Sequence, residues 1–198
     1  MILSDRDIKK ALAEKKIMID PLFPNSIQPA SVDVHLGAHF LVFKNTDNTC
    51  IDLKEPIDDI MEPLIIDEKR QFILHPGEFA LGMTYETVSV PHDMVLQLNG
   101  KSSLGRVGLI VHATAGYVDP GNTLKITLEL HNLANLPIKL YYKMPIAQVA
   151  FVKLSSEVDV PYGKKGLNSK YYGSTKPIAS QYYKNFLKNK GWLNFKKK

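Results

Sequence analysis

The pattern of apolar and polar positions predicts one short helix near the start of the chain. Ser4 is a favourable N-cap residue, and Ile8, Ala11 and Leu12 follow it at the spacing of one helical face. We therefore expect a helix over residues 5–15 that packs its apolar face on the core.

After this helix, short apolar or alternating runs separated by turn sequences indicate strands. The expected strands are 31–36, 40–43, 71–74, 79–84, 95–98, 107–111, 125–130, 138–141 and 147–154. Their spacing is typical of a β-sandwich or barrel and not of βαβ units, so we expect a largely antiparallel β fold. Residues 180–190, closed by Gly191, are expected to form a short C-terminal helix.

Length and composition indicate one domain. With 198 residues, of which 44% are hydrophobic, the chain can bury one sizeable core, so a single domain over residues 1–198 is expected.

No stretch approaches the roughly 20 apolar residues of a membrane span, and the first residues lack the apolar run of a signal peptide. We expect a cytoplasmic protein without a membrane partner. The single cysteine, Cys50, excludes an intrachain disulfide and a multi-cysteine zinc site.

The net charge of +5 is unevenly distributed along the chain. Residues 161–198 contain ten Lys and no Asp or Glu, which leaves 15 basic and 20 acidic side chains in the first 160 residues. A mildly acidic body with a strongly basic tail suggests that the tail meets phosphates or another polyanion. The alternative is a solvated tail with loose terminal residues.

Two loops carry the polar and glycine residues expected of a ligand site. Residues 99–106 combine two cations, two hydroxyls and two glycines, which could cradle an oxyanion although the order of a Walker A loop is absent. Residues 114–121 form a predicted hairpin in which Tyr117 could stack on a base and Asp119 could accept a hydrogen bond from a sugar hydroxyl. Each loop could equally be an ordinary polar turn.

An alternating strand and a C-terminal segment complete the candidates. Lys125, Thr127, Glu129 and His131 share one face of a predicted strand. Glu129 is therefore either exposed to solvent or part of a site in which it takes and gives a proton. Residues 161–175 mix lysine, tyrosine and glycine, which suits a flap that closes over a nucleotide but also a loose tail.

In this order, the segments resemble the dCTP deaminase branch of the trimeric dUTPase superfamily. The matching segments are 1–8, 29–37, 74–78, 100–106, 114–121 and 126–130. Residues 100–106, Gly-Lys-Ser-Ser-Leu-Gly-Arg, are similar to the family's Gly-Arg-Ser-Ser-Leu-Gly-Arg signature. The resemblance implies a mainly β subunit, a distorted antiparallel β-barrel of the dUTPase-like β-clip type, with a short N-terminal helix and a C-terminal flap and tail over residues 161–198. It also implies a homotrimer with active sites shared between neighbours.

The resemblance further implies hydrolytic deamination of dCTP at C4 of cytosine, with no zinc and with Glu129 as general acid and base. Ser102 and the carbonyl of Ala115 would hold the nucleophilic water, and Arg106 would support the charge that develops around the base. Asp119 would bind the 3′-hydroxyl of the deoxyribose. Other substrate contacts are implied for Lys101, Ser103, Leu104, Gly105, Thr127, Leu128, Gln148, Tyr162, Lys170 and Ser174. Mg²⁺ would bind through phosphate oxygens of the substrate.

Gly116-Tyr117 resembles the members that continue from dUTP to dUMP, so the expected products are dUMP, ammonia and diphosphate. The chain departs from the family at three places. Lys101 replaces the usual arginine and loses its planar fork. Ser174 stands in place of a glutamine that reaches the nucleotide, and residues 122–124 replace an aromatic-x-Gly sequence.

Other functions fit the same residues. A dCTP deaminase that stops at dUTP, or a plain dUTPase in which Glu129 is structural, would need little change in sequence. A different alternative is a binding or regulatory protein that uses this scaffold and the basic tail to bind nucleic acid or a partner. We expect the enzyme, with dCTP or dUTP and not nucleic acid as its partner.

Overall fold

The computed structural model describes residues 1–44, 47, 49–114 and 116–187. Two α-helices lie in this part of the chain, α1 (Asp5–Ala13) and α2 (Ser102–Gly105), together with two 3₁₀ turns, η1 (Asp58–Ile60) and η2 (Tyr182–Asn185). The strands are β1 (Met18–Asp20), β2 (Ile27–Gln28), β3 (Ser31–His35), β4 (His39–Phe43), β5 (Met61–Ile65), β6 (Phe72–Leu74), β7 (Phe79–Ser89), β8 (Met94–Gly100), β9 (Leu109–Ile110), β10 (Tyr117–Val118), β11 (Thr123–Asn132), β12 (Ile138–Leu140) and β13 (Pro145–Lys153).

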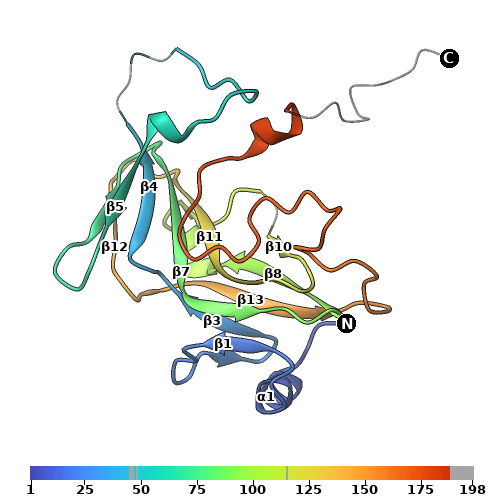
Figure 1. Cartoon of the computed structure of the whole chain (residues 1–198). Coiled ribbons are helices and arrows are strands. Elements are labelled where there is room, and N and C mark those ends of the chain that lie inside the picture. The colour runs from blue at the N-terminus through green and yellow to red at the C-terminus, as the bar shows by residue number, and fades with distance from the viewer. Residues whose placement is uncertain (45–46, 48, 115, 188–198) are drawn as a thin grey trace.

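Two antiparallel sheets form most of the molecule (Figure 1). In the first, β5, β4, β7, β11 and β9 are neighbours in that order, and β1 also pairs with β7. In the second the order is β10, β8, β13, β3 and β2, while β12 and β6 form a separate pair. The mainly antiparallel β architecture predicted from the sequence, with its short N-terminal helix, is confirmed.

Alternate side chains of both sheets form one hydrophobic core. Phe40 of β4, Leu96 of β8, Leu128 and Leu130 of β11, and Phe151 of β13 are each at most 1% exposed and belong to the same cluster. Burial of these apolar side chains holds the two sheets together.

Helix α1 begins as the sequence predicts. The hydroxyl of Ser4 accepts a hydrogen bond from the N–H of Asp7, which satisfies one free donor of the first turn. Ile8 is completely buried in the core. The ammonium of Lys9, 2.9 Å from the carboxylate of Asp5, lowers the pKa of Asp5. No helix of the described residues has the length and apolar character needed to cross a membrane.

A bulge interrupts the pairing of β7 with β11 and leaves the alternation of buried and half-buried side chains along β11 unchanged. The register shifts between Lys125 and Thr127. The hydroxyl of Thr84 accepts the N–H of Ile126 at 2.9 Å, so the backbone group released from the ladder keeps a partner. Beyond the bulge, odd-numbered side chains of β11 are half-buried and even-numbered ones are buried.

Several predicted elements differ in extent. The expected strand 107–111 is shortened to β9, because Gly108 adopts a positive φ of 83° in a turn. The expected helix 180–190 is only η2 in the described residues, and 188–190 lie outside them. Strands β1, β2, β5 and β10 were not predicted as strands.

Candidate active site

Glu129 occupies the middle of β11, opposite Leu81 of β7. Its side chain is half-buried, whereas Leu128 and Leu130 on either side point into the core and are fully buried. Strand alternation therefore directs one carboxylate out of an otherwise apolar strand.

A loop between β9 and β10 holds this carboxylate. Glu129 Oε2 accepts the backbone N–H groups of Ala113 and Thr114, both at 3.1 Å. The Thr114 hydroxyl lies 3.0 Å from Oε2 and 3.2 Å from Oε1, so it can donate to either oxygen. We call residues 113–114 with Glu129 the carboxylate clasp.

The carboxylate lines a cavity of about 550 Å³, a volume suited to a small organic ligand. One wall is apolar and is formed by Phe43, Ile51, Leu53, Ile57, Met61, Phe79 and Leu81. Thr127 and Glu129 of β11, together with His112 and Tyr117, also line the cavity. A ligand in this cavity can therefore contact both apolar side chains and a carboxylate.

Gly116 and Tyr117 separate this cavity from a second one of about 460 Å³, which both residues also line. Tyr117 is 63% exposed, so its ring is available to a ligand. The loop needs glycine at 116 because a Cβ there would stand 2.5 Å from the carbonyl oxygen of Leu98. The second cavity extends to Gly100, the residue before Lys101.

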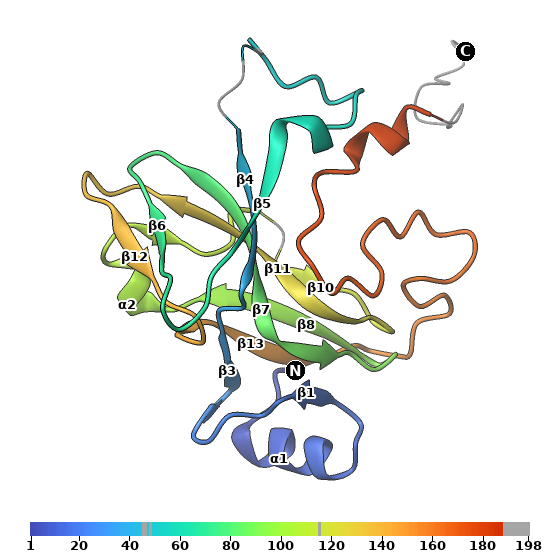
Figure 2. The same ribbon diagram turned by 60° about the vertical axis from the view of Figure 1, so that its left-hand side comes forward.

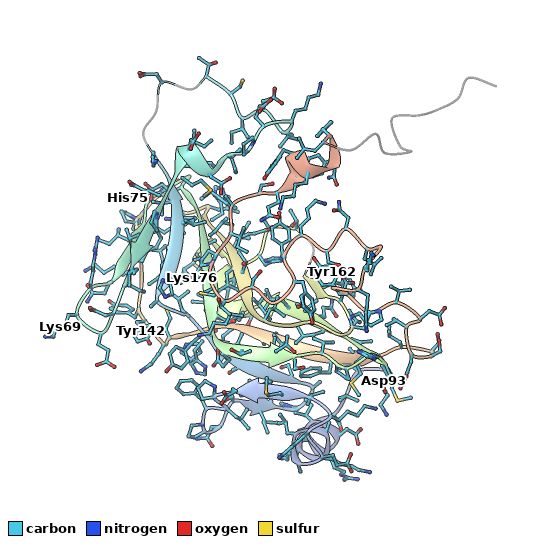
Figure 3. All side chains as sticks on the ribbon, in the orientation of Figure 1. Lys69, His75, Asp93, Tyr142, Tyr162 and Lys176 are labelled. Atoms are coloured by element: carbon cyan, nitrogen blue, oxygen red, sulfur yellow. The ribbon has the colours of Figure 1, made fainter. Side chains whose placement is uncertain are left out.

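Asp119 and Tyr162 line a third cavity of about 340 Å³ together with Ser169. The backbone N–H of Tyr162 donates to the carbonyl of Pro120 at 2.9 Å, which brings the C-terminal segment beside β10 (Figure 3). The predicted sugar-binding carboxylate and the predicted flap thus lie together.

Hydrogen bonds attach residues 173–174 of the predicted flap to the start of β11. Asn122 is buried, and its Oδ1 accepts the N–H of Gly173 at 3.2 Å. The N–H of Lys125 donates to the carbonyl of Ser174 at 2.8 Å. The Ser174 hydroxyl donates to the carbonyl of Tyr171 at 2.7 Å, and both residues line the cavity that contains Glu129. We call these contacts the flap anchor.

Two of the predicted contacts to phosphate or sugar, Lys101 and Gln148, lie beside β3. The Lys101 ammonium lies 2.7 Å from Asp33 Oδ2. Gln148 of β13 is the register partner of Asp33, and its Oε1 accepts a hydrogen bond from the Ser31 hydroxyl at 3.2 Å. Lys101 and Gln148 are therefore both next to Asp33.

Helix α2 carries the predicted residues Ser102, Ser103, Leu104 and Gly105, and Arg106 follows it. All are exposed except Leu104, which is half-buried. None of the described residues between 101 and 106 lines the cavity that contains Glu129. Figure 2 shows α2 and the C-terminal segment on opposite sides of β7 and β11.

The cavity that contains Glu129 is thus lined, within one chain, by the predicted site residues Gly116, Tyr117, Thr127, Glu129 and Ser174. Asp119 and Tyr162 line the third cavity. Lys170 belongs to the flap and is half-buried. Leu128 is buried, so only its backbone can reach a ligand. Ala115 lies outside the described residues.

Sequence reasoning missed three polar residues of these groups. Thr114 lies in the predicted hairpin 114–121, Asn122 in the departing residues 122–124 and Asp33 in the matching segment 29–37. The sequence assigned none of the three an individual role. The alternation of Ser31 and Asp33 along β3 is the signal that could have drawn attention to Asp33. Thr114 and Asn122 give no comparable signal.

In the part of the chain that the structure describes, there is no group of three or more His, Cys, Asp or Glu side chains that could hold a metal ion. Oxygen atoms of a bound triphosphate are the ligands that Mg²⁺ prefers.

Comparison with solved structures defines the class of fold. The 2′-deoxycytidine 5′-triphosphate deaminase from Agrobacterium tumefaciens superposes with a TM-score of 0.58 at 23% sequence identity. The match covers 76% of this chain and 47% of that chain. The chain therefore shares the fold of that protein.

Sequence comparison then gives the family. The family described as dCTP deaminase-like matches residues 2–154. Proteins named dCTP deaminase, dUMP-forming are similar over nearly the whole chain: that of Dictyoglomus turgidum is 51% identical over 91% of this chain and 94% of its own, and that of Corynebacterium kroppenstedtii is 48% identical over 94% of this chain and 100% of its own. The chain belongs to the dCTP deaminase-like family.

Proposed function

We propose that the protein converts dCTP to dUMP in two hydrolytic steps, releasing ammonia and diphosphate. The observation that carries this proposal is the carboxylate of Glu129, held in place at the wall of a cavity large enough for a nucleoside. The names of relatives that are 44–51% identical support the same reaction.

In the first step a water adds to C4 of cytosine. Glu129 takes one proton from the water and passes it to the ring nitrogen N3, which leaves a hydroxyl on C4. It then moves the proton of this hydroxyl to the amino group, which leaves as ammonia. Ser102 and the carbonyl of Ala115 would hold the water, while Arg106 supports the charge on the base. Oxygen replaces nitrogen at C4, so cytosine becomes uracil.

In the second step another water attacks the α-phosphorus, and diphosphate leaves from dUTP to give dUMP. Mg²⁺, bound by phosphate oxygens, would neutralise the charge of the leaving diphosphate. Lys101, Ser103, Gln148, Tyr162 and Lys170 would contact the phosphates or the sugar. Leu104, Gly105, Thr127, Leu128 and Ser174 complete the proposed binding residues.

Asp119 and Tyr117 would select the sugar. The carboxylate of Asp119 can accept a hydrogen bond from the 3′-hydroxyl, and the exposed ring of Tyr117 can exclude a 2′-hydroxyl above it. Ribonucleotides would then bind poorly.

The separation of α2 from the cavity of its own chain supports a homotrimer with shared sites. Residues 101–106 of one subunit would complete the cavity that holds Glu129 of its neighbour. A closed ring of three identical subunits uses one such contact three times.

The test is incubation of the pure protein with dCTP and Mg²⁺, followed by separation of dCTP, dUTP and dUMP. We expect dUMP and ammonia without a build-up of dUTP. The Glu129→Gln variant keeps the size of the side chain but cannot accept the proton, so its deamination rate should fall at least about a thousandfold.

Two other outcomes identify the alternatives. Accumulation of dUTP from dCTP would assign a deaminase that stops after the first step. Hydrolysis of added dUTP with dCTP untouched would assign a plain dUTPase and overturn the proposed deamination.

A further inference from the structure

The carboxylate clasp contains one donor that depends on the identity of a side chain. The N–H groups of residues 113 and 114 are present with any residue other than proline. The hydroxyl of Thr114, at 3.0 and 3.2 Å from the two oxygens of Glu129, is the donor of the clasp that a side-chain substitution can remove.

The two carboxylate oxygens are unequally engaged. Among bonds between described residues, Oε2 accepts two backbone N–H groups and lies within reach of the hydroxyl, while Oε1 has only the longer approach of that hydroxyl. Each carboxylate oxygen offers about two lone-pair directions. Oε1 therefore keeps capacity for a water, and Oε2 serves as the fixed end of the group.

Threonine suits this position for a second reason. Its branched Cβ restricts rotation about χ1, so the hydroxyl is directed at Glu129 at a small entropic cost. The clasp also crosses between separate elements, since Thr114 belongs to the loop before β10 and Glu129 to the centre of β11. The position of this loop therefore affects the orientation of the Glu129 carboxylate.

We infer that Thr114 is a positioning residue for Glu129. Its hydroxyl, nearer to Oε2, helps to hold the carboxylate in place and leaves Oε1 directed to the proton that is transferred. This inference rests on the proposed function, because it assigns Glu129 the proton transfer.

The experiment compares Thr114→Val, which removes the hydroxyl and keeps the branched shape, with Thr114→Ser, which keeps the hydroxyl. Loss of one hydrogen bond to a charged group should lower kcat for deamination about tenfold in Thr114→Val. KM for dCTP should stay within about threefold of the wild type, because the change affects the orientation of the carboxylate. Thr114→Ser should restore kcat to within about threefold of the wild type.

Thr123→Val is the matched control. Thr123 lies on the same strand, and its hydroxyl bonds to the Ser89 hydroxyl and not to a carboxylate. The Thr123→Val variant should keep the kcat and KM of the wild type. Melting temperatures of all variants establish that they fold.

The possible failures are distinguishable. If the wild type deaminates dCTP and Glu129→Gln does not, but Thr114→Val has an unchanged kcat, the inference about Thr114 is wrong and the proposed function stands. The inference is also wrong if Thr114→Ser is as impaired as Thr114→Val. If Glu129→Gln retains full activity, the proposed role of Glu129 is wrong, and the inference about Thr114 falls with it.

Discussion

Leu128 and Glu129 show how much depends on a single position of a strand. Leu128 is completely buried and Glu129 is half-buried, although they are adjacent. A slip of one residue in the pairing of β11 would expose the leucine and bury the carboxylate. The fold and the site therefore use opposite faces of the same strand.

The core role of Leu128 can be measured by chemical denaturation. Leu128→Ala leaves a cavity among fully buried neighbours, so the free energy of unfolding should fall by about 2–5 kcal/mol. Leu136→Ala is the control, because Leu136 is 74% exposed and its truncation should change stability by less than about 0.5 kcal/mol. Equal losses in the two variants would contradict this account of the core.

At the residue scale, the sequence predicts side chains whose role depends on their own strand or motif. The alternation of β11 was enough to place Glu129 outside the core. The role of Thr114 was not predictable in this way, because its partner lies 15 residues away and meets it only after the loop has folded against β11. Asp33 and Lys101 meet across 68 residues for the same reason.

Loss of the flap anchor should weaken substrate binding more than it slows the reaction. Asn122→Ala removes the acceptor for the N–H of Gly173 and should loosen residues 171–174 at the wall of the cavity. We expect KM for dCTP to rise about tenfold and cleavage by trypsin after Lys170 or Lys176 to become faster, with a smaller change in kcat.

Asn122→Asp retains an oxygen acceptor and should behave more like the wild type. Melting temperatures separate this local effect from general unfolding. An unchanged KM in Asn122→Ala, with normal resistance to trypsin, would show that the anchor does not control the flap.

Among the elements, the strands with longer apolar or alternating runs were predicted, and very short or mostly exposed strands were missed. β5 carries Glu62 and Pro63, lies at the edge of its sheet and has a mostly exposed pattern, so neither periodicity nor propensity marks it. β1, β2 and β10 have two or three residues and depend on the strands they pair with. The order of strands in the sheets could not be predicted from local pattern.

At the scale of the whole molecule, the proposed trimer predicts that two inactive variants restore each other. Glu129→Gln subunits would still supply Arg106, and Arg106→Ala subunits would still supply Glu129. After unfolding and refolding of an equal mixture, about a quarter of the sites should contain both intact residues. Deamination by the mixture should reach a similar fraction of wild-type activity.

Each variant refolded alone is the control and should stay inactive. If the mixture also stays inactive although mixed trimers form, both residues act within one chain. Sedimentation or light scattering gives the number of subunits independently. The sequence suggested this arrangement only by resemblance, because no pattern within one chain shows which surface meets another copy.

The ion pair between Lys101 and Asp33 has a consequence for the end of the catalytic cycle. The ammonium already has a carboxylate partner 2.7 Å away before any nucleotide binds. If Lys101 binds the substrate's phosphates as proposed, a nucleotide has to compete with Asp33 for it, and a triphosphate competes far better than a monophosphate. Once diphosphate has left, the carboxylate can recapture the lysine, so dUMP should be a weak product inhibitor and turnover should continue as product accumulates.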